Sequence, residues 1–177
     1  MSKWVIDPDH SVAAFSISHM TVAFVHGQMN DVSGIIHFDP DNDIGLEIAF
    51  EIGASSILTG IGKRDDHLKS ADFFDLENFP KISFKSNKVS KAVLNIFTVS
   101  GDLSIHGITK TVTLDVEFAG PVKSPFGETT IGLTGKTVLN RENFKISWNE
   151  PLESGGFMVG KEVEISVDLE ADLTESD

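Results

Sequence analysis

The 177-residue chain contains no cysteine and no tyrosine, and it is short of positive charge. The absence of cysteine excludes disulfides, thiolate metal sites and cysteine nucleophiles. Lysine and arginine number 14 against 27 aspartates and glutamates, so the formal charge is −13. A field of that sign repels nucleic acid and anionic membrane surfaces, so we expect neither as a partner.

Long hydrophobic runs are also missing, although 40% of the residues are hydrophobic. No run approaches the roughly 18 residues of a membrane-spanning helix, so we expect no stable membrane insertion. The first residues show neither the basic region nor the apolar region of a signal peptide, which predicts a cytoplasmic location. With tyrosine absent, 13 phenylalanines supply most of the aromatic surface without a polar group, which suits an apolar lining.

Apolar and polar residues alternate with period two along most of the chain. The clearest case runs from Val163 to Glu170, where every second residue is apolar. Such alternation is typical of β-strands with one face in water. It predicts eight strands, at 12–24, 32–39, 46–52, 81–89, 92–105, 111–118, 130–139 and 161–171.

Turn residues separate most of these runs, at 39–43, 90–91, 106–107 and 124–127. Short connections between successive strands make them antiparallel neighbours, so the sequence predicts an antiparallel meander. Closing the sheet removes exposed edges, and we therefore expect an all-β, closed eight-stranded barrel in one domain, residues 1–177. A β-sandwich is the alternative, because periodicity does not show closure.

The segment 59–80 breaks the alternation. One or two helical turns fit around 64–70, and Phe73, Phe74 and Phe79 follow. We interpret residues 60–80 as a short helical lid between two strands. Its phenylalanines either line a ligand tunnel or plug one end of the barrel. A second stretch without alternation, 140–160, is predicted to be a long loop.

Several motifs, correctly ordered and spread over nearly the whole chain, resemble those of the YceI-like family of polyisoprenoid-binding proteins. They are Trp4-x-Ile6-Asp7-x-x-His10-Ser11, Phe15-x-Ile17-x-His19, Arg64-Asp65-x-His67-Leu68-x-Ser70-x-Asp72-Phe73-Phe74-Asp75, Phe79-Pro80-x-Ile82-x-Phe84-x-Ser86, Gly101-Asp102-Leu103-x-Ile105-His106-Gly107-x-Thr109-Lys110 and Asn140-Arg141-x-x-Phe144. The resemblance implies a lipocalin-like barrel that holds an isoprenoid or a similar amphiphile lengthwise.

Strand phase and the resemblance together indicate which residues contact a ligand. His19 shares the inward phase of Phe15 and Ile17, and a buried polar group needs a partner, either a ligand headgroup or a backbone carbonyl. Asn95 poses the same question. The expected ligand-binding residues are Phe15, Ile17, His19, Arg64, Asp72, Phe73, Phe74, Phe84, Asn95 and Phe144.

Phase alone predicts the remaining lining of the lumen. The small inward residues Ala13, Gly34 and Gly101 favour a real cavity, since a barrel of eight strands is otherwise just filled by side chains. The residues predicted to point inward are Phe15, Ile17, Ile36, Phe38, Ile48, Phe50, Phe84, Leu114, Val116, Ile165 and Val167.

Neither a catalytic site nor a metal site is expected. The six histidines lack the spacing of a ready ligand set, and Asp7, His10 and Ser11 imitate part of a triad without a nucleophile elbow, which favours a structural turn. We expect a non-catalytic carrier of a polyprenol, an isoprenoid quinone or a similar lipid, with no cofactor besides this cargo. Two alternatives stay open: an isomerase or cyclase that uses an inward His or Asp, and a filled barrel with a structural or interaction role.

Outward apolar residues predict self-association. Leu94 and Ile96 fall on the outer phase of strand 92–105, and Ile35 is likewise out of phase on its own strand. Exposed residues of that size often form an interface, and two-fold dimers are the commonest oligomers, so we expect a homodimer. The alternative is a β-bulge that turns Leu94 and Ile96 inward.

Overall fold

The structure is a computed structural model that describes residues 1–40 and 44–174. Its strands are β1 (Ser2–Ile6), β2 (Val12–His19), β3 (Ala23–Met29), β4 (Val32–Asp39), β5 (Ile44–Gly53), β6 (Lys81–Val93), β7 (Ile96–Ile105), β8 (Ile108–Lys123), β9 (Thr129–Asn140) and β10 (Val159–Thr174). The helical elements are α1 (Gly62–Lys69) and the 3-10 turns η1 (Pro8–His10), η2 (Ala54–Ser56) and η3 (Arg141–Phe144). Within the described ranges, no helix has the length and apolar character to cross a membrane.

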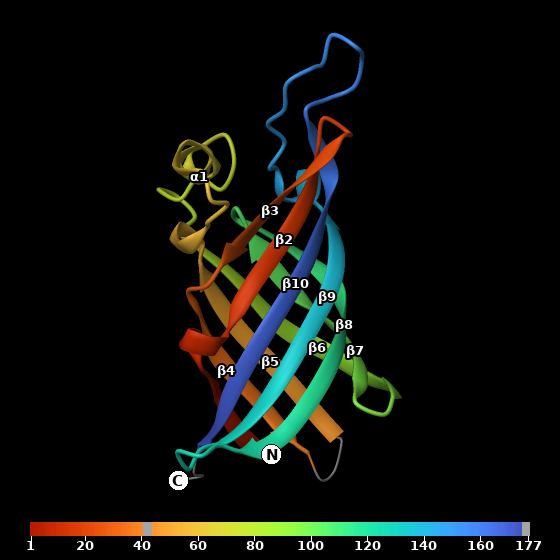
Figure 1. The fold of residues 1–177 in the computed structure, drawn as a ribbon. Coiled ribbons are helices and arrows are strands. Elements are labelled where there is room, and N and C mark those ends of the chain that lie inside the picture. Colours follow the sequence, from red (N-terminus) through yellow and green to blue (C-terminus); the bar gives the residue numbers. More distant parts are fainter. Residues whose placement is uncertain (41–43, 175–177) are drawn as a thin grey trace.

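The strands form one antiparallel sheet that closes on itself (Figure 1). Its order is β1-β4-β5-β6-β7-β8-β9-β10-β2-β3, and β1 also pairs with β10. β10 makes the closure, because its residues 159–168 pair with β2 and its residues 171–174 pair with β1. β1 and β2 are thus two halves of one interrupted strand, and so are β3 and β4. Counted in this way, the fold is the predicted closed eight-stranded meander.

The interruption between β1 and β2 is a tight polar turn. Asp7 caps η1 by accepting a hydrogen bond from the Asp9 amide at 2.9 Å, and its other carboxylate oxygen lies 2.7 Å from Nδ1 of His10. The hydroxyl of Ser11 is bonded instead to the backbone of Glu170. These residues form the expected structural turn, not a triad.

Two of the predicted strand runs contain a turn. Run 12–24 includes the β2–β3 hairpin, where Met20 and Thr21 have φ of 51° and 60°. Run 92–105 includes the β6–β7 hairpin, where Asn95 has φ of 60°, and the turn expected at 90–91 is strand. Apolar residues continue the alternation through both turns, which is why periodicity missed them.

The other connections are closer to expectation. The turns at 106–107 and 124–127 are confirmed between β7 and β8 and between β8 and β9. The helical turns expected around 64–70 are α1. Of the turn expected at 39–43, residues 41–43 lie outside the described residues.

The end of the barrel away from α1 is packed solid around four aromatic residues, Trp4, Phe38, Phe97 and Phe118, which we call the aromatic plug. The Phe38 ring lies 5.9 Å from that of Phe97 and 4.9 Å from that of Phe118, and the Trp4 indole donates to the Phe38 carbonyl oxygen. All four are buried. The lumen is therefore filled at this end.

The residues predicted to point inward are all buried or half-buried, so their strand phase is confirmed. Eight of them belong to the buried hydrophobic core, and four of these eight, Ile36, Phe38, Ile48 and Val116, line no cavity inside the barrel. The interpretation of Gly34 and Gly101 as residues that open the lumen is wrong, because the backbone of Ala49 and Phe50 lies against Gly34 and the Phe84 ring lies against Gly101. The rings of Phe50 and Phe84 stack with centroids 5.3 Å apart.

Candidate ligand-binding site

Two neighbouring cavities occupy the half of the barrel nearest α1. The inner chamber, of about 130 Å³, is lined almost entirely by apolar side chains of the barrel wall, among them Ala13, Phe50, Phe84 and Leu114. The outer chamber, of about 230 Å³, lies beneath α1 and the 145–160 loop. The chambers share five lining residues: Phe15, Phe74, Arg141, Ile146 and Val163. These cavities contradict the filled-barrel alternative.

Most residues expected to contact a ligand line these chambers. Phe84 and Phe144 line the inner chamber, Phe15 and Phe74 line both, and the outer chamber is lined by Ile17, His19, Arg64 and Phe73. Whether they hold a ligand stays a prediction. Asn95 was placed wrongly, since it is exposed in the β6–β7 turn, at the opposite end from α1 (Figure 1).

The lid is anchored through Thr59, just before α1. The buried Asp65 carboxylate accepts hydrogen bonds from the Thr59 amide at 2.8 Å and from its hydroxyl at 2.5 Å. These bonds lower the pKa of Asp65 below its ordinary value. Arg64 donates to the Thr59 hydroxyl and carbonyl oxygens at 2.7 and 2.9 Å. Part of the Arg64 guanidinium is thus engaged in holding the lid.

An aromatic cluster around His67 joins the lid to the 145–160 loop. The His67 ring packs edge-on against Phe73 and Trp148, with centroids 5.0 and 4.8 Å away. Its Nε2 lies 2.8 Å from a carboxylate oxygen of Asp72. Asp72 is therefore a surface partner of His67 and lines neither chamber, and its contact with a ligand stays a prediction.

The 145–160 loop is held by Arg141 and Asn149. The buried guanidinium of Arg141 donates to the carbonyl oxygens of Gly160, Ile146 and Trp148 at 2.8–2.9 Å. Burial lowers the pKa of Arg141 below its ordinary value. Asn149 bonds to both the amide and the carbonyl of Val159. These bonds fix a segment that lies mostly outside the named strands, so that it forms one wall of the outer chamber.

Sequence reasoning missed the lining residues that this loop contributes. Ile146, Trp148 and Met158 line the outer chamber, but a loop has no periodicity that would give their direction. For Arg141 a signal was present, since it belongs to the motif Asn140-Arg141-x-x-Phe144. His67 likewise stood in a motif without being assigned a role.

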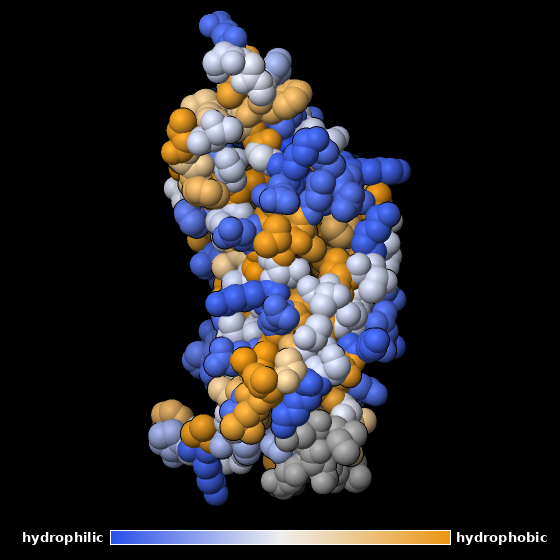
Figure 2. Space-filling view, turned by 90° about the vertical axis from the view of Figure 1, so that its right-hand side faces the viewer, coloured by the Kyte–Doolittle hydropathy of each residue, from blue (hydrophilic) through white to orange (hydrophobic). Residues whose placement is uncertain are grey.

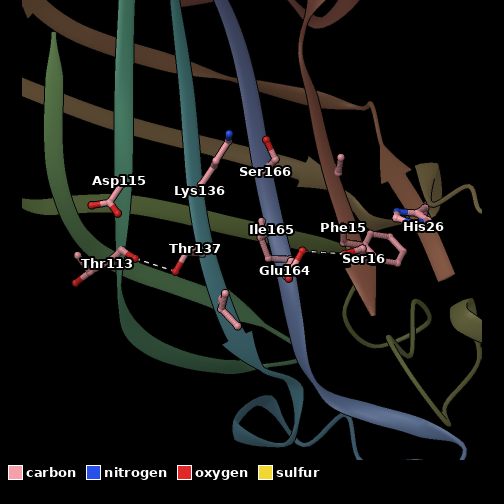
Figure 3. A pocket seen from close by; sticks show the side chains of 12 residues that line it. Phe15, Ser16, His26, Thr113, Asp115, Lys136, Thr137, Glu164, Ile165 and Ser166 are labelled. Atoms are coloured by element: carbon pink, nitrogen blue, oxygen red, sulfur yellow. Dashed lines mark hydrogen bonds between the residues drawn. The ribbon is translucent and has the colours of Figure 1, made fainter. Parts of the chain in front are cut away.

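A hollow of about 780 Å³ lies on the outer face of the barrel across β8, β9, β10, β2 and β3 (Figure 3). Charged side chains such as Asp115, Lys136 and Glu164 project into it, and the Ser16 hydroxyl donates to Glu164 at 3.2 Å. It is an open depression on the surface, so a molecule bound there stays largely in contact with water. An apolar molecule gains little there, in contrast to the chambers.

One further polar group was not foreseen. Potential metal-ligating atoms of Asp7, His10 and Glu170 lie within 4.8 Å of one another on the barrel surface. Glu170 comes from the opposite end of the sequence, so spacing gave no sign of the group. The hydrogen bond between Asp7 and His10 holds two of these three side chains together. It lowers the pKa of Asp7 and raises the pKa of His10.

A closed eight-stranded antiparallel barrel with apolar chambers under a short helical lid defines a lipocalin-like class of proteins. The chain belongs to the YceI-like family, whose domain matches residues 4–171.

Its relatives match over almost their full lengths. UPF0312 protein SAS2572 of Staphylococcus aureus is 38% identical over 176 residues, 99% of this chain and 100% of the relative. BcnA of Burkholderia cenocepacia has a crystal structure with a TM-score of 0.80 and 25% identity, covering 93% of this chain and 98% of that one. A polyisoprenoid binding domain from Saccharophagus degradans shares the fold, with a TM-score of 0.69 at 15% identity, covering 98% of this chain and 100% of that one.

Proposed function

We propose that this protein binds a long apolar amphiphile, such as a polyprenol or an isoprenoid quinone, and carries it without changing it chemically. The observation that supports this best is the pair of neighbouring apolar chambers, which share five lining residues and lie between the lid and the aromatic plug. The inner chamber, at 130 Å³, is smaller than the roughly 300–1,000 Å³ of most ligand pockets. A long ligand therefore spans both chambers along the barrel.

The polar end of such a ligand belongs in the outer chamber. Each buried CH₂ group contributes about 0.8 kcal/mol, so the affinity comes chiefly from the tail. A headgroup left without partners inside costs a few kcal/mol, about 1–3 by protein mutational data. His19, Arg64 and His67 offer polar atoms in the outer chamber. The description of the Saccharophagus degradans domain as polyisoprenoid binding agrees with this ligand class.

Two measurements test the proposal. The chain has two tryptophans, of which Trp148 lines the outer chamber and Trp4 is buried in the aromatic plug. A short-tailed quinone should quench the fluorescence of Trp148 saturably, and Trp148→Phe should remove most of that signal while Trp4→Phe keeps it. Mass spectrometry of an organic extract of the purified protein should show an isoprenoid lipid. A lipid-free extract together with no saturable quenching contradicts the proposal.

The homodimer also remains a proposal, supported by the β6–β7 hairpin. Val93, Leu94 and Ile96 are exposed there, by 60%, 77% and 38%. The alternative, a β-bulge that turns Leu94 and Ile96 inward, is contradicted because both side chains are exposed. Light scattering at micromolar concentration should give a dimer mass for the unchanged chain and a monomer mass for Leu94→Asp. The cytoplasmic location stays a prediction, and cell fractionation would test it.

A further inference from the structure

Exposed apolar side chains collect around the opening of the outer chamber. Their exposed fractions run from 38% for Met20 to 79% for Val22. Figure 2 shows apolar surface at the upper end of the molecule, below the polar tip of the 145–160 loop. We call this set the apolar rim, and its members are Met20, Val22, Phe24, Leu58, Ile61 and Phe157.

Backbone pairing brings the rim residues together from three segments. The Met20 amide donates to the Met158 carbonyl oxygen at 2.7 Å, which sets the β2–β3 hairpin beside Phe157. The bridge between Gln28 and Leu58 aligns residues 57–61 with β3. Sequence neighbours of the rim, including His19, Val25 and Met158, line the outer chamber. The rim is thus continuous with the cavity.

The three segments that carry the rim have no net charge, in a chain of formal charge −13. Segments 19–28, 57–70 and 145–160 contain four cations and four anions, which are Lys63, Arg64, Lys69, Lys145, Asp65, Asp66, Glu150 and Glu153. The net negative charge therefore resides on the rest of the chain, including the three anions of lid residues 71–80. An anionic surface repels that body, whereas a surface without net charge accepts the neutral, apolar end.

We propose that the apolar rim docks on a zwitterionic lipid bilayer, and that the ligand passes there between the bilayer and the outer chamber. The transfer step rests on the proposed function. Rim side chains such as Val22 and Phe24 bury their apolar area at the boundary of headgroups and acyl chains. The acidic body stays in water, so attachment is shallow and reversible.

Co-sedimentation with phosphatidylcholine vesicles tests the docking. The rim variant is Val22→Asp with Phe24→Asp, and the control is Val122→Asp with Phe126→Asp, on the β8–β9 hairpin away from the mouth. The control residues are also exposed, by 65% and 90%. We expect the control to sediment like the unchanged chain and the rim variant to sediment at least tenfold less. Adding phosphatidylglycerol should weaken sedimentation of the unchanged chain.

Three outcomes overturn the docking proposal. They are no sedimentation of the unchanged chain, equal loss in both variants, and a rim-dependent dimer by light scattering, which would assign the rim to a second copy. Quenching of Trp148 by a quinone added from ethanol tests ligand binding separately. The rim variant should keep that quenching, since Val22 and Phe24 line neither chamber. Failure of the quenching with sedimentation intact contradicts only the proposed ligand.

Discussion

The ring of Phe15 fills the space that a side chain at residue 27 would need. Phe15 and Gly27 face each other across the β2–β3 pair, and a Cβ atom on Gly27 would overlap Cζ of that ring and lie 2.7 Å from Cε1. Phe15 lines both chambers. The position of this ring between the two chambers therefore depends on a glycine in the neighbouring strand.

Gly27→Ala should narrow the space beside Phe15 in both chambers. The added methyl group pushes the Phe15 ring toward the chambers, so we expect several-fold weaker quinone binding in the Trp148 titration. Overpacking of this kind costs about 1–3 kcal/mol of stability. Gly132→Ala is the matched control, because its Cβ would lie 3.8 Å from Cβ of Ala119, an ordinary contact. Unchanged affinity in the Gly27 variant would show that Phe15 does not limit access.

Arg141→Met should release the 145–160 loop. It leaves carbonyl oxygens of Gly160, Ile146 and Trp148 without their donor, and each unpaired buried group costs about 1–3 kcal/mol. Because some of these oxygens can reach water, we expect a loss of about 2–4 kcal/mol in the free energy of unfolding by urea.

The control for that variant is Lys161, the residue after Gly160. Its side chain forms an exposed ion pair at 3.1 Å with Glu142, the residue after Arg141. Lys161→Met should change the free energy of unfolding by less than about 1 kcal/mol. Equal effects of the two substitutions would contradict the role given to Arg141.

Ile165→Glu should abolish lipid retention, because it places a carboxylate in the apolar inner chamber. His19→Ala should weaken retention only modestly, since the tail supplies most of the affinity. Mass spectrometry of lipid kept through purification compares the two. If Ile165→Glu unfolds, Ile165→Phe fills the chamber without a charge and should also reduce retention. A lumen variant that keeps its cargo while His19→Ala loses it would mean that the ligand is held from outside.

The pair of Asp7 and His10 should make stability depend on pH. Its hydrogen bond raises the pKa of His10 above 6.5, so this stabilisation is complete below pH 6.5 and is lost as the pH rises through the raised value. The same bond lowers the pKa of Asp7 below 3.8, so that contribution is present above pH 3.8 and is lost as the pH falls through the lowered value.

His10→Gln should therefore lower the melting temperature more at pH 5.5 than at pH 8.5. His26→Gln serves as the control, because His26 lines the hollow on the outer face of the barrel (Figure 3). An equal change at both pH values in the His10 variant would exclude the charged pair as the cause. The effect should be small, since the His10 side chain is 64% exposed.

The sequence was sufficient for the parts of the fold that follow strand period. Inward phase was correct for residues as far apart as Ile36 and Val167, because a buried face fixes register strongly. Period two says nothing about where a strand ends when apolar residues continue through the turn. At Asn95 the available signal was the residue type, since asparagine tolerates the left-handed conformation that this turn requires.

The site was predictable where strands carry it and not where loops do. Phe15, Ile17 and His19 share one strand, so phase placed them together in the lumen. Asp72 has no strand to orient it, and its pairing with His67 depends on how the lid folds back. The space beside Gly101 was likewise open to two interpretations, because composition does not tell whether a ligand or the Phe84 ring occupies it.

The aromatic plug turns the barrel into a blind tube. With Phe38, Phe97 and Phe118 closing the far end, a chain threaded in from the lid side has no exit ahead of it. Under the proposed function, the segment of the ligand that enters first would leave last, and the headgroup would face the entrance. The depth above the plug thus sets how much tail is enclosed, so lipids with longer tails should leave the excess outside and gain no further affinity from it.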